Sequence, residues 1–307
     1  MAQPFDWLSF AACNEIPERL TAIESWHRHI PFAFAVLAMA RPRVLVELGT
    51  HRGDSYCAFC QGIASQGLAT RCFAVDTWQG DIHSGLYDDD VYADLSAFHD
   101  PRYSGFSTLL RMTFDQALPL FADGGIDLLH IDGLHTYDAV RHDFESWLPK
   151  LSDRAVVLLH DTNVQRDGFA VWRLWGELRA RYRGFEFPYG SGLGVSLVGP
   201  NAPARLAQFI SIANDEPEHV TGFFHSMGDG AALRKSSNDL ALARARVESL
   251  GAQLSHARSV VELRDRQLQE LNAVREHLEQ KMTAIHELLH QEQVRPLQEV
   301  PNPDERP

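Results

Sequence analysis

The sequence predicts an α/β protein, in which a doubly wound, mostly parallel sheet is followed by a C-terminal α-helical coiled coil. Two patterns carry this prediction. Between residues 44 and 198, short and nearly continuous apolar runs alternate with stretches long enough for a helix, which is typical of parallel strands buried on both faces. After residue 233 the apolar positions recur about every 3.5 residues instead, which is typical of a coiled coil.

Four apolar runs form the predicted centre of the sheet. They cover residues 44–48, 72–76, 126–131 and 155–159. Each is separated from the next by enough residues for a covering helix, so a doubly wound arrangement follows. Two weaker runs, 185–187 and 194–198, lie near Pro188 and several glycines. We expect them to close the sheet as an antiparallel hairpin.

The C-terminal pattern extends over about eight heptads. With Leu233 as position a, fourteen of the seventeen a and d positions up to Leu289 are apolar if alanine is counted. A helix of this length would measure about 85 to 90 Å. Arg264 and Arg275 fall at core positions and would weaken the coil or set its register. We expect a homo-oligomer through this coil; a single solvated helix, or one that packs back on the sheet domain, is the alternative.

These patterns divide the chain into five segments. Between the sheet and the coil the apolar pattern fades, and Pro203 and Pro217 favour a linker; the last fifteen residues hold four prolines. The expected segments are an N-terminal helical segment at 1–30, the sheet domain at 31–200, a linker at 201–232, the coiled coil at 233–292 and a disordered tail at 293–307.

Composition excludes several classes of partner and site. A net charge of −13 argues against nucleic acid, because binding a phosphate backbone needs a concentrated basic surface. Cys57 and Cys60 have the spacing of a redox or metal motif, but no second pair accompanies them, so we interpret them as buried apolar residues. The N-terminus lacks the pattern of a signal peptide. The sequence also contains no run of about 18 to 20 apolar residues, which is the length needed to span a membrane. We expect a cytoplasmic protein, with peripheral association at the inner membrane face as a variant of that prediction.

The turn after the first strand has the composition of a cofactor loop. It reads Glu47-Leu-Gly-Thr-His-Arg-Gly-Asp-Ser55, and its glycines, Gly49 and Gly53, allow a tight turn and the close approach of a ligand. In a doubly wound sheet, ligands bind outside the carboxyl ends of the strands. Asp76 ends the second strand, where its carboxylate could accept hydrogen bonds from both hydroxyls of a ribose.

The loop favours S-adenosylmethionine over a dinucleotide. A dinucleotide needs Gly-x-Gly-x-x-Gly, because the middle glycine lets the backbone approach a pyrophosphate. His51 stands at that middle position and Asp54 at the position of the third glycine. The bulk of His51 and the negative charge of Asp54 both oppose a bound pyrophosphate. S-adenosylmethionine contains an adenosine but no phosphate. A purely structural turn is the alternative, and the presence of Glu47 and Asp76 argues against it.

Two further acids follow neighbouring strands. Asp132 comes just after the run at 126–131 and Asp161 just after the run at 155–159, which are the expected fourth and fifth strands of the fold. Adjacent strands lie about 4.8 Å apart, so these carboxylates could share one hard cation. Without a cation they would repel each other, and one would bind a proton near neutral pH.

Four segments carry a resemblance to a known family. VELGTHRGDS, FAVDTW, LLHIDGLHTYDAVRHDFESWLPKL and VVLLHDT are similar to the Rossmann-like class I methyltransferases of the metal-dependent sugar and antibiotic O-methyltransferase type. That type includes domains joined to glycosyltransferases in bacterial surface-polysaccharide (O-antigen) synthesis. The resemblance covers about residues 30 to 200, and the stretch from Asp132 to Tyr137 is its most specific part.

The resemblance implies a role for individual residues. For the cofactor, it places Glu47, Gly49 and Gly53 in the S-adenosylmethionine loop, Thr50, His51 and Ser55 near the methionine end, and Asp76 at the ribose. Asp132 would contact both the cofactor and the metal, and Asp161 would bind Mg²⁺ or a similar ion together with it. His135 would be the general base. A neutral imidazole suits the last role, because its pKa lies near that needed to remove a hydroxyl proton at pH 7.

One position departs from the family pattern. Relatives of this type usually carry two consecutive acids after the fifth strand, where this chain has His160 and Asp161. Histidine can bind a metal, but Mg²⁺ prefers oxygen, so His160 as a ligand favours a softer ion. The long stretch 78–103 after the ribose acid is either a lid or a solvated acidic loop.

The resemblance implies metal-assisted methyl transfer from S-adenosylmethionine to a hydroxyl of a sugar or glycan, with glycosyltransferases as candidate partners. Two other functions stay open. The same fold could carry other metal-dependent chemistry such as hydroxylation, or the chain could be a non-catalytic coiled-coil scaffold. A scaffold has no need for Glu47, Asp76, Asp132, His135 and Asp161 at these spacings.

Overall fold

The computed structural model describes residues 11–83, 85–166 and 168–293. The chain divides into two units, residues 1–239 and residues 240–307. The first unit contains the sheet and its covering helices, and the described part of the second is helical. None of the described helices combines the length and the apolar character needed to cross a membrane.

A seven-stranded sheet forms the centre of the first unit. Its order is β5 (Ser107–Arg111), β2 (Arg71–Asp76), β1 (Val44–Leu48), β6 (Ile126–Ile131), β7 (Leu151–His160), β9 (Leu193–Leu197) and β8 (Arg183–Phe187). The first five strands are parallel, and β9 pairs antiparallel with both β7 and β8. The predicted doubly wound sheet with a closing antiparallel hairpin is therefore confirmed. Strand β5 at the edge is an addition, because its short run was not recognised in the sequence.

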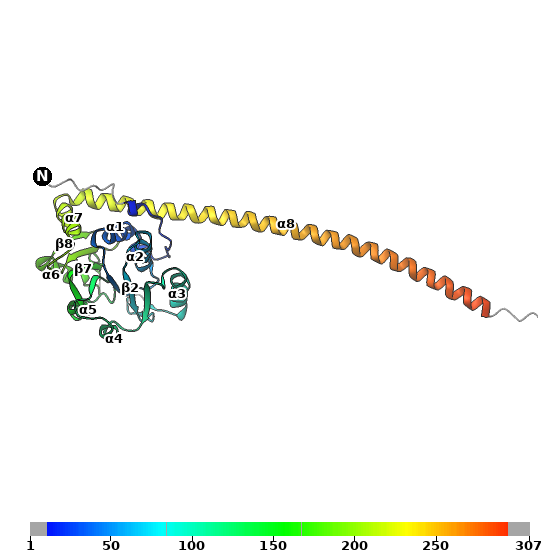
Figure 1. The fold of residues 1–307 in the computed structure, drawn as a ribbon, viewed down its shortest axis with the longest axis horizontal. Coiled ribbons are helices and arrows are strands. Elements are labelled where there is room, and N and C mark those ends of the chain that lie inside the picture. Colours follow the sequence, from blue (N-terminus) through cyan, green and yellow to red (C-terminus); the bar gives the residue numbers. More distant parts are fainter. Residues whose placement is uncertain (1–10, 84, 167, 294–307) are drawn as a thin grey trace, which may run out of the picture. The chain divides into compact units, whose positions relative to one another are not determined.

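Helices cover both faces of the sheet (Figure 1). Alternate residues of the central strands face opposite layers, so that Leu45 packs in one apolar cluster and Val46 in the other. One face carries α1 (Ile30–Ala40), α2 (Asp54–Ser65), α3 (Asp89–Tyr103) and α7 (Ala204–Asp215), and the other carries α4 (Phe114–Ala117), α5 (Tyr137–Trp147) and α6 (Val171–Arg181). Single-turn 3₁₀ segments at 118–120 and 148–150 complete the described elements of this region.

The N-terminal segment is less regular than predicted. Its described part contains two short 3₁₀ helices, Ala11–Asn14 and Glu24–His29, joined by irregular chain. This chain lies on α2, where the amide and hydroxyl of Thr21 each donate to a carboxylate oxygen of Asp54 at 2.6 Å. Hydrogen bonds to the start of α2 thus replace the internal bonds of a longer helix.

The predicted linker at 201–232 forms helix instead, because its prolines stand where helices begin. Pro203 precedes the first residue of α7, and Pro217 begins α8 (Pro217–Gln293). The first turn of a helix has no use for the N–H that proline lacks. Phe209 of α7 and Phe224 of α8 are fully buried in the core of the first unit.

The predicted coiled coil at 233–292 falls entirely within α8. The large apolar side chains from Leu240 to Leu289 are exposed within the single chain; Val247, for example, is 69% exposed. The helical part of the prediction agrees with the structure, while the pairing of helices stays a prediction. The predicted disordered tail lies, from residue 294 on, outside the described residues.

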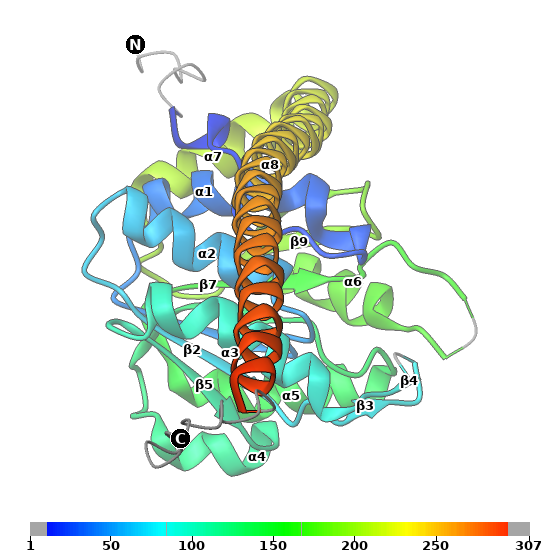
Figure 2. The same cartoon turned by 90° about the vertical axis from the view of Figure 1, so that its right-hand side faces the viewer.

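The described part of the stretch 78–103 contains regular structure. It contains a small hairpin, β3 (Gly80–Asp81) and β4 (Gly85–Leu86), followed by α3. The hairpin is separate from the main sheet (Figure 2).

Candidate active site

The loop after β1 is held against the end of β6. The Gly49 amide donates to the Val75 carbonyl at 3.0 Å, and the Asp132 amide donates to the Leu48 carbonyl at 2.8 Å. Gly49 has a φ of +85°, and a Cβ there would lie 2.1 Å from the carbonyl oxygen of Asp132. Only glycine fits this position, and the loop and Asp132 therefore share one fixed geometry.

Asp76 holds the loop from the other side. Its Oδ2 accepts hydrogen bonds from the amides of Thr50 and His51, both at 2.9 Å, and its Oδ1 accepts one from the Trp78 amide at 2.7 Å. A carboxylate offers about four lone-pair sites, so three amides leave room for about one further donor. The structure thus gives the predicted ribose residue a second task, which is to shape the loop.

Glu47 lies beneath the loop. Its side chain is fully buried, and its Oε2 lies 2.8 Å from Nδ1 of the equally buried His130. Burial raises the pKa of Glu47, although hydrogen bonds from His130 and Ser55 oppose this shift. Glu47, Gly53 and Ser55 are not among the residues that line the cavity described next, and their part in binding the cofactor stays a prediction.

A cavity of about 570 Å³ opens at the carboxyl ends of the central strands, a volume typical of ligand pockets. Its walls contain the predicted residues Gly49, Thr50, His51, Asp76, Asp132, His135, His160 and Asp161. The Thr50 hydroxyl is buried here and has no hydrogen-bond partner among the described residues. A bound molecule could supply that partner, because buried polar groups are rarely left unpaired.

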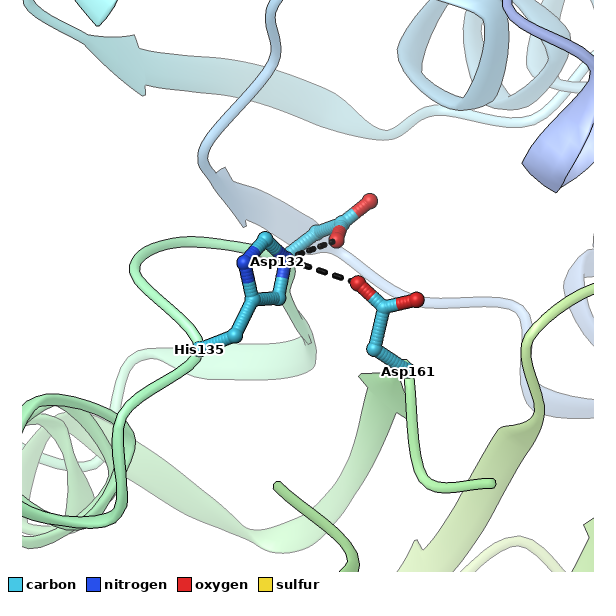
Figure 3. Close-up of side chains that lie close together, drawn as sticks. All are labelled: Asp132, His135 and Asp161. Atoms are coloured by element: carbon cyan, nitrogen blue, oxygen red, sulfur yellow. Dashed lines mark ion pairs between the residues drawn. The ribbon is translucent and has the colours of Figure 1, made fainter. Parts of the chain in front are cut away.

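Three of the side chains that line this cavity, Asp132, His135 and Asp161, converge on one another (Figure 3). One ligand atom from each of Asp132, His135 and Asp161 lies within 4.8 Å of the other two. His135 Nε2 is 2.7 Å from Asp161 Oδ2 and 3.8 Å from Asp132 Oδ1. Asp161 has a left-handed φ of +58°, a strained conformation that is often found at functional sites. Two carboxylates and an imidazole form a donor set that suits a divalent transition ion or Mg²⁺.

Comparison with known proteins assigns the region that contains these residues. Residues 46–162 match a family model described as a methyltransferase domain. This region of the chain is therefore similar to a methyltransferase domain. The match includes the loop, Asp76, the metal-ligand candidates and the strands from β1 to β7, and it agrees with the predicted methyltransferase over these residues.

A curated relative resembles part of the chain. An uncharacterized protein of Sinorhizobium fredii, y4gI, is 49% identical over 191 residues, which are 62% of this chain and 21% of that protein. The chain therefore spans about a fifth of the length of this relative.

Similar solved structures include three methyltransferases. One from Geobacter sulfurreducens is 17% identical, with 55% of this chain and 77% of that chain covered and a TM-score of 0.41. The O-methyltransferase TomG of Streptomyces achromogenes, in complex with S-adenosylmethionine, is 14% identical (58% and 90% covered, TM-score 0.40). The Podospora anserina methyltransferase PaMTH1, bound to S-adenosylhomocysteine, is 13% identical (64% and 97% covered, TM-score 0.43).

His135, the predicted general base, faces two negative charges. Burial lowers its pKa, but the carboxylates of Asp132 and Asp161 outweigh that effect and raise the pKa to about 10. The contact with Asp161 is the closer one, since 3.8 Å from Asp132 exceeds a hydrogen bond. As long as no cation binds there, the protonated imidazole is the counter-ion of both carboxylates.

His160, predicted as a metal ligand, is occupied by other contacts. Its Nδ1 lies 3.1 Å from Asp132 Oδ1, and its Nε2 lies 3.1 Å from the Gly190 carbonyl oxygen. Burial lowers its pKa, but the charges of Asp132 and Asp161 prevail and raise the pKa to about 9. In the ion-free protein, a protonated His160 donates through both nitrogens. Its role as a metal ligand stays a prediction, since its Nδ1 faces both carboxylates of the cluster, at 3.1 Å from Asp132 Oδ1 and 3.6 Å from Asp161 Oδ1.

Several of the residues that line the cavity were not predicted. Thr113 and Phe114 follow β5, Ile23 and Ser25 belong to the N-terminal segment, His83 and Tyr87 belong to the stretch 78–103, and Arg166 follows β7. Tyr87 stacks on His51 with 4.5 Å between ring centroids. The stretch 78–103 thus reaches the site, which its length alone had indicated. For the others the sequence carries no signal, because each belongs to a different segment.

Proposed function

We propose that the chain transfers a methyl group from S-adenosylmethionine to a hydroxyl of a sugar or glycan, with the help of a divalent cation. One observation carries the proposal. The Asp132–His135–Asp161 cluster and the Gly49–His51 loop line the same cavity, so that a methyl donor on the loop and a hydroxyl at the cluster would meet.

The cavity residues fit the donor. Asp76 keeps about one lone-pair site for a ribose hydroxyl, and the Thr50 hydroxyl lacks a partner within the described structure. Phe114 lines the same cavity and offers a flat apolar face for the adenine ring. His51 stands where a dinucleotide would need glycine, which excludes a pyrophosphate at this turn.

The donor set also fits a divalent ion, which Asp132 and Asp161 would hold with His135 beside them. A bound ion would neutralise charge and lower the pKa of a hydroxyl next to it. His135 can accept the hydroxyl proton only after its own proton has left. A cation on Asp132 and Asp161 cancels the charges that hold the pKa of His135 at about 10, so we expect ion binding to release a proton and free Nε2 to act as the base. The reaction forms an oxygen–methyl bond and breaks the sulfur–methyl bond of the donor.

The test combines donor binding with methyl transfer. Calorimetry measures binding of S-adenosylmethionine with and without Mg²⁺ or Mn²⁺, and labelled donor then reports transfer to free, nucleotide-linked and lipid-linked sugars. We expect His135→Ala and Asp161→Asn each to lower turnover about 100-fold or more, as loss of acid–base catalysis does. His142→Ala is the matched control, because His142 is exposed on α5 and pairs with Asp115 outside the cavity.

Each negative outcome contradicts a different part of the proposal. Absence of donor binding under every metal condition would favour a non-catalytic scaffold. Binding of the donor followed by near-full turnover of both cluster variants would show that Asp161 and His135 do not act in the reaction. Metal-dependent turnover that hydroxylates the acceptor would assign another chemistry to the same cluster.

We also propose that the chain forms a homo-oligomer through the coiled coil of α8. The a and d side chains from residue 240 on are more than half exposed where they are large and apolar, as for Leu240 at 52% and Val247 at 69%. A contiguous apolar stripe of this length favours burial against a second helix. The same arm is the proposed docking element for glycosyltransferases.

A further inference from the structure

Two segments far apart in the sequence meet beside His135, which lines the cavity. His83 of the β3–β4 hairpin places its Nδ1 3.3 Å from Nδ1 of His135. The ring of Phe169, from the loop before α6, lies 4.5 Å from each imidazole, and the two imidazoles are 5.5 Å apart. These three distances place both histidines on the same side of the Phe169 ring. Figure 2 shows the hairpin beside the loop that leads into α6.

The loop is tied to the catalytic end of the cavity. The Ala170 amide donates to the His135 carbonyl at 2.8 Å, and the Phe169 amide donates to the Arg166 carbonyl at 3.0 Å. Gly168 has a φ of +84°, and a Cβ there would lie 2.7 Å from His83 Nε2. The close approach of the two segments therefore requires glycine, and Arg166 stands on a loop with defined contacts.

Arg166 differs from most of the other arginines that lie over aromatic rings. Its guanidinium carbon is 4.0 Å from the Phe169 ring centroid, and the side chain lines the cavity. Six other arginines lie over a ring and also form an ion pair with a carboxylate; they are Arg19, Arg102, Arg111, Arg141, Arg173 and Arg179. Within the described residues, which omit residue 167, Arg166 and Arg181 lie over a ring without such an ion pair, and of these two only Arg166 lines the cavity. In a chain of net charge −13, a cation left unpaired in a ligand cavity indicates a bound anion.

We propose that Arg166 binds an anionic group of the acceptor, and that the enzyme methylates an acidic sugar, with a carboxylate or phosphate on the same residue that carries the reacting hydroxyl. This inference rests on the proposed function. A guanidinium binds both anions through paired hydrogen bonds. Arg166 and His135 both contact Phe169. The guanidinium carbon of Arg166 is 4.0 Å from the Phe169 ring centroid, and the His135 ring centroid is 4.5 Å from it. The anion and the reacting hydroxyl would therefore belong to one small acceptor.

A second source of the same chemistry is the carboxylate at the methionine end of the donor. The loop of Gly49, Thr50 and His51 would hold that end, and no contact joins Arg166 to these three residues within the described structure. Arg166 follows Asp161 in sequence and packs, through Phe169, against His135. The acceptor's anion is thus the better match, and the experiment separates the two.

The test is calorimetry on the full chain, with and without bound S-adenosylhomocysteine. D-Glucuronate and glucose 6-phosphate are the anionic probes, and D-glucose is the neutral one. We expect the wild type to bind at least one anionic sugar about tenfold or more tightly than glucose, since a hydrogen bond to a charged group has that effect. Arg166→Met should abolish this preference. Arg173→Met is the matched control, because Arg173 also lies over a ring, at 3.8 Å from Tyr137, but outside the cavity.

The outcomes decide between the two sources. Loss of the acid preference in Arg166→Met, with unchanged affinity for S-adenosylhomocysteine and a preference kept in Arg173→Met, supports the proposal. Equal or absent binding of acidic and neutral sugars by the wild type overturns it, as does a preference that survives in Arg166→Met. Weaker S-adenosylhomocysteine binding by Arg166→Met, with the preference intact, assigns Arg166 to the donor. Because the titrations need no turnover and include the donor-free protein, failure of methyl transfer would appear separately.

Discussion

Replacing Gly49 by alanine tests whether the cofactor loop and Asp132 share one geometry. Two effects act on this substitution. Gly49 has a φ of +85°, and the added Cβ would lie 2.1 Å from the Asp132 carbonyl oxygen. Gly67 is the matched control, because its φ is +59° while a Cβ there would meet no heavy atom within 4 Å. Gly67→Ala thus carries the conformational penalty alone.

The difference between the two variants isolates the contact with Asp132. A left-handed alanine costs about 1 to 2 kcal/mol, and this penalty is common to both. Overpacking against a neighbour that cannot move adds about 1 to 3 kcal/mol, and that neighbour is backbone at the end of a central strand. We expect Gly49→Ala to lower the free energy of unfolding by about 2 to 5 kcal/mol in total.

Urea unfolding of both variants, with calorimetry of S-adenosylmethionine and Mn²⁺, measures the effect. Gly49→Ala should also weaken binding of the donor and the ion, since it displaces the backbone that carries Asp132, while Gly67→Ala leaves both affinities unchanged. Equal losses of stability in the two variants, or a Gly49→Ala protein with wild-type affinities, would refute the proposed coupling.

Three further predictions concern the ion, the core and the arm. The folded-state pKa of His135 is raised to about 10. Its contribution to the stability of the ion-free protein is therefore complete below the unfolded pKa of about 6.5 and is lost as the pH rises through 10. The urea midpoint should fall over this pH range, and both His135→Gln and saturating Mn²⁺ should make it less dependent on pH. Phe224→Ala should lower the free energy of unfolding by about 3 to 5 kcal/mol, because Phe224 is fully buried in the core. If the variant unfolds in urea like the wild type, residues 217–232 do not contribute to the core and are better described as a linker. Truncation after Asp239, at the boundary between the two units, should leave a folded, monomeric methyltransferase domain, and light scattering that still shows an oligomer would place assembly outside the α8 coil.

The central sheet could be read from the sequence because its signals are local. Strands buried on both faces appear as continuous apolar runs, and the carboxyl ends of parallel strands meet at one edge. For this reason Asp76, Asp132 and Asp161, each placed at the end of a run, could be expected to lie near one another, and the structure gathers all three around one cavity.

The same local reasoning failed where one signal has two meanings. Pro203 and Pro217 are typical of a linker and equally of a helix start, and only the burial of Phe209 and Phe224 against the sheet's covering helices decides between them. Strand β5 was missed because five residues at a sheet edge, partly exposed, carry too weak a pattern.

By itself, the sequence determined the doubly wound sheet, the helical period of the C-terminal arm and the residues that end each central strand. Only the tertiary structure decided the directions of the side chains beyond those ends. The left-handed φ of Asp161 turns its carboxylate toward His135, while His160, one residue earlier, bonds to the Gly190 carbonyl. His83 and Phe169 reach His135 from segments that no sequence spacing relates, because their contact depends on how two loops pack and not on the local pattern of either.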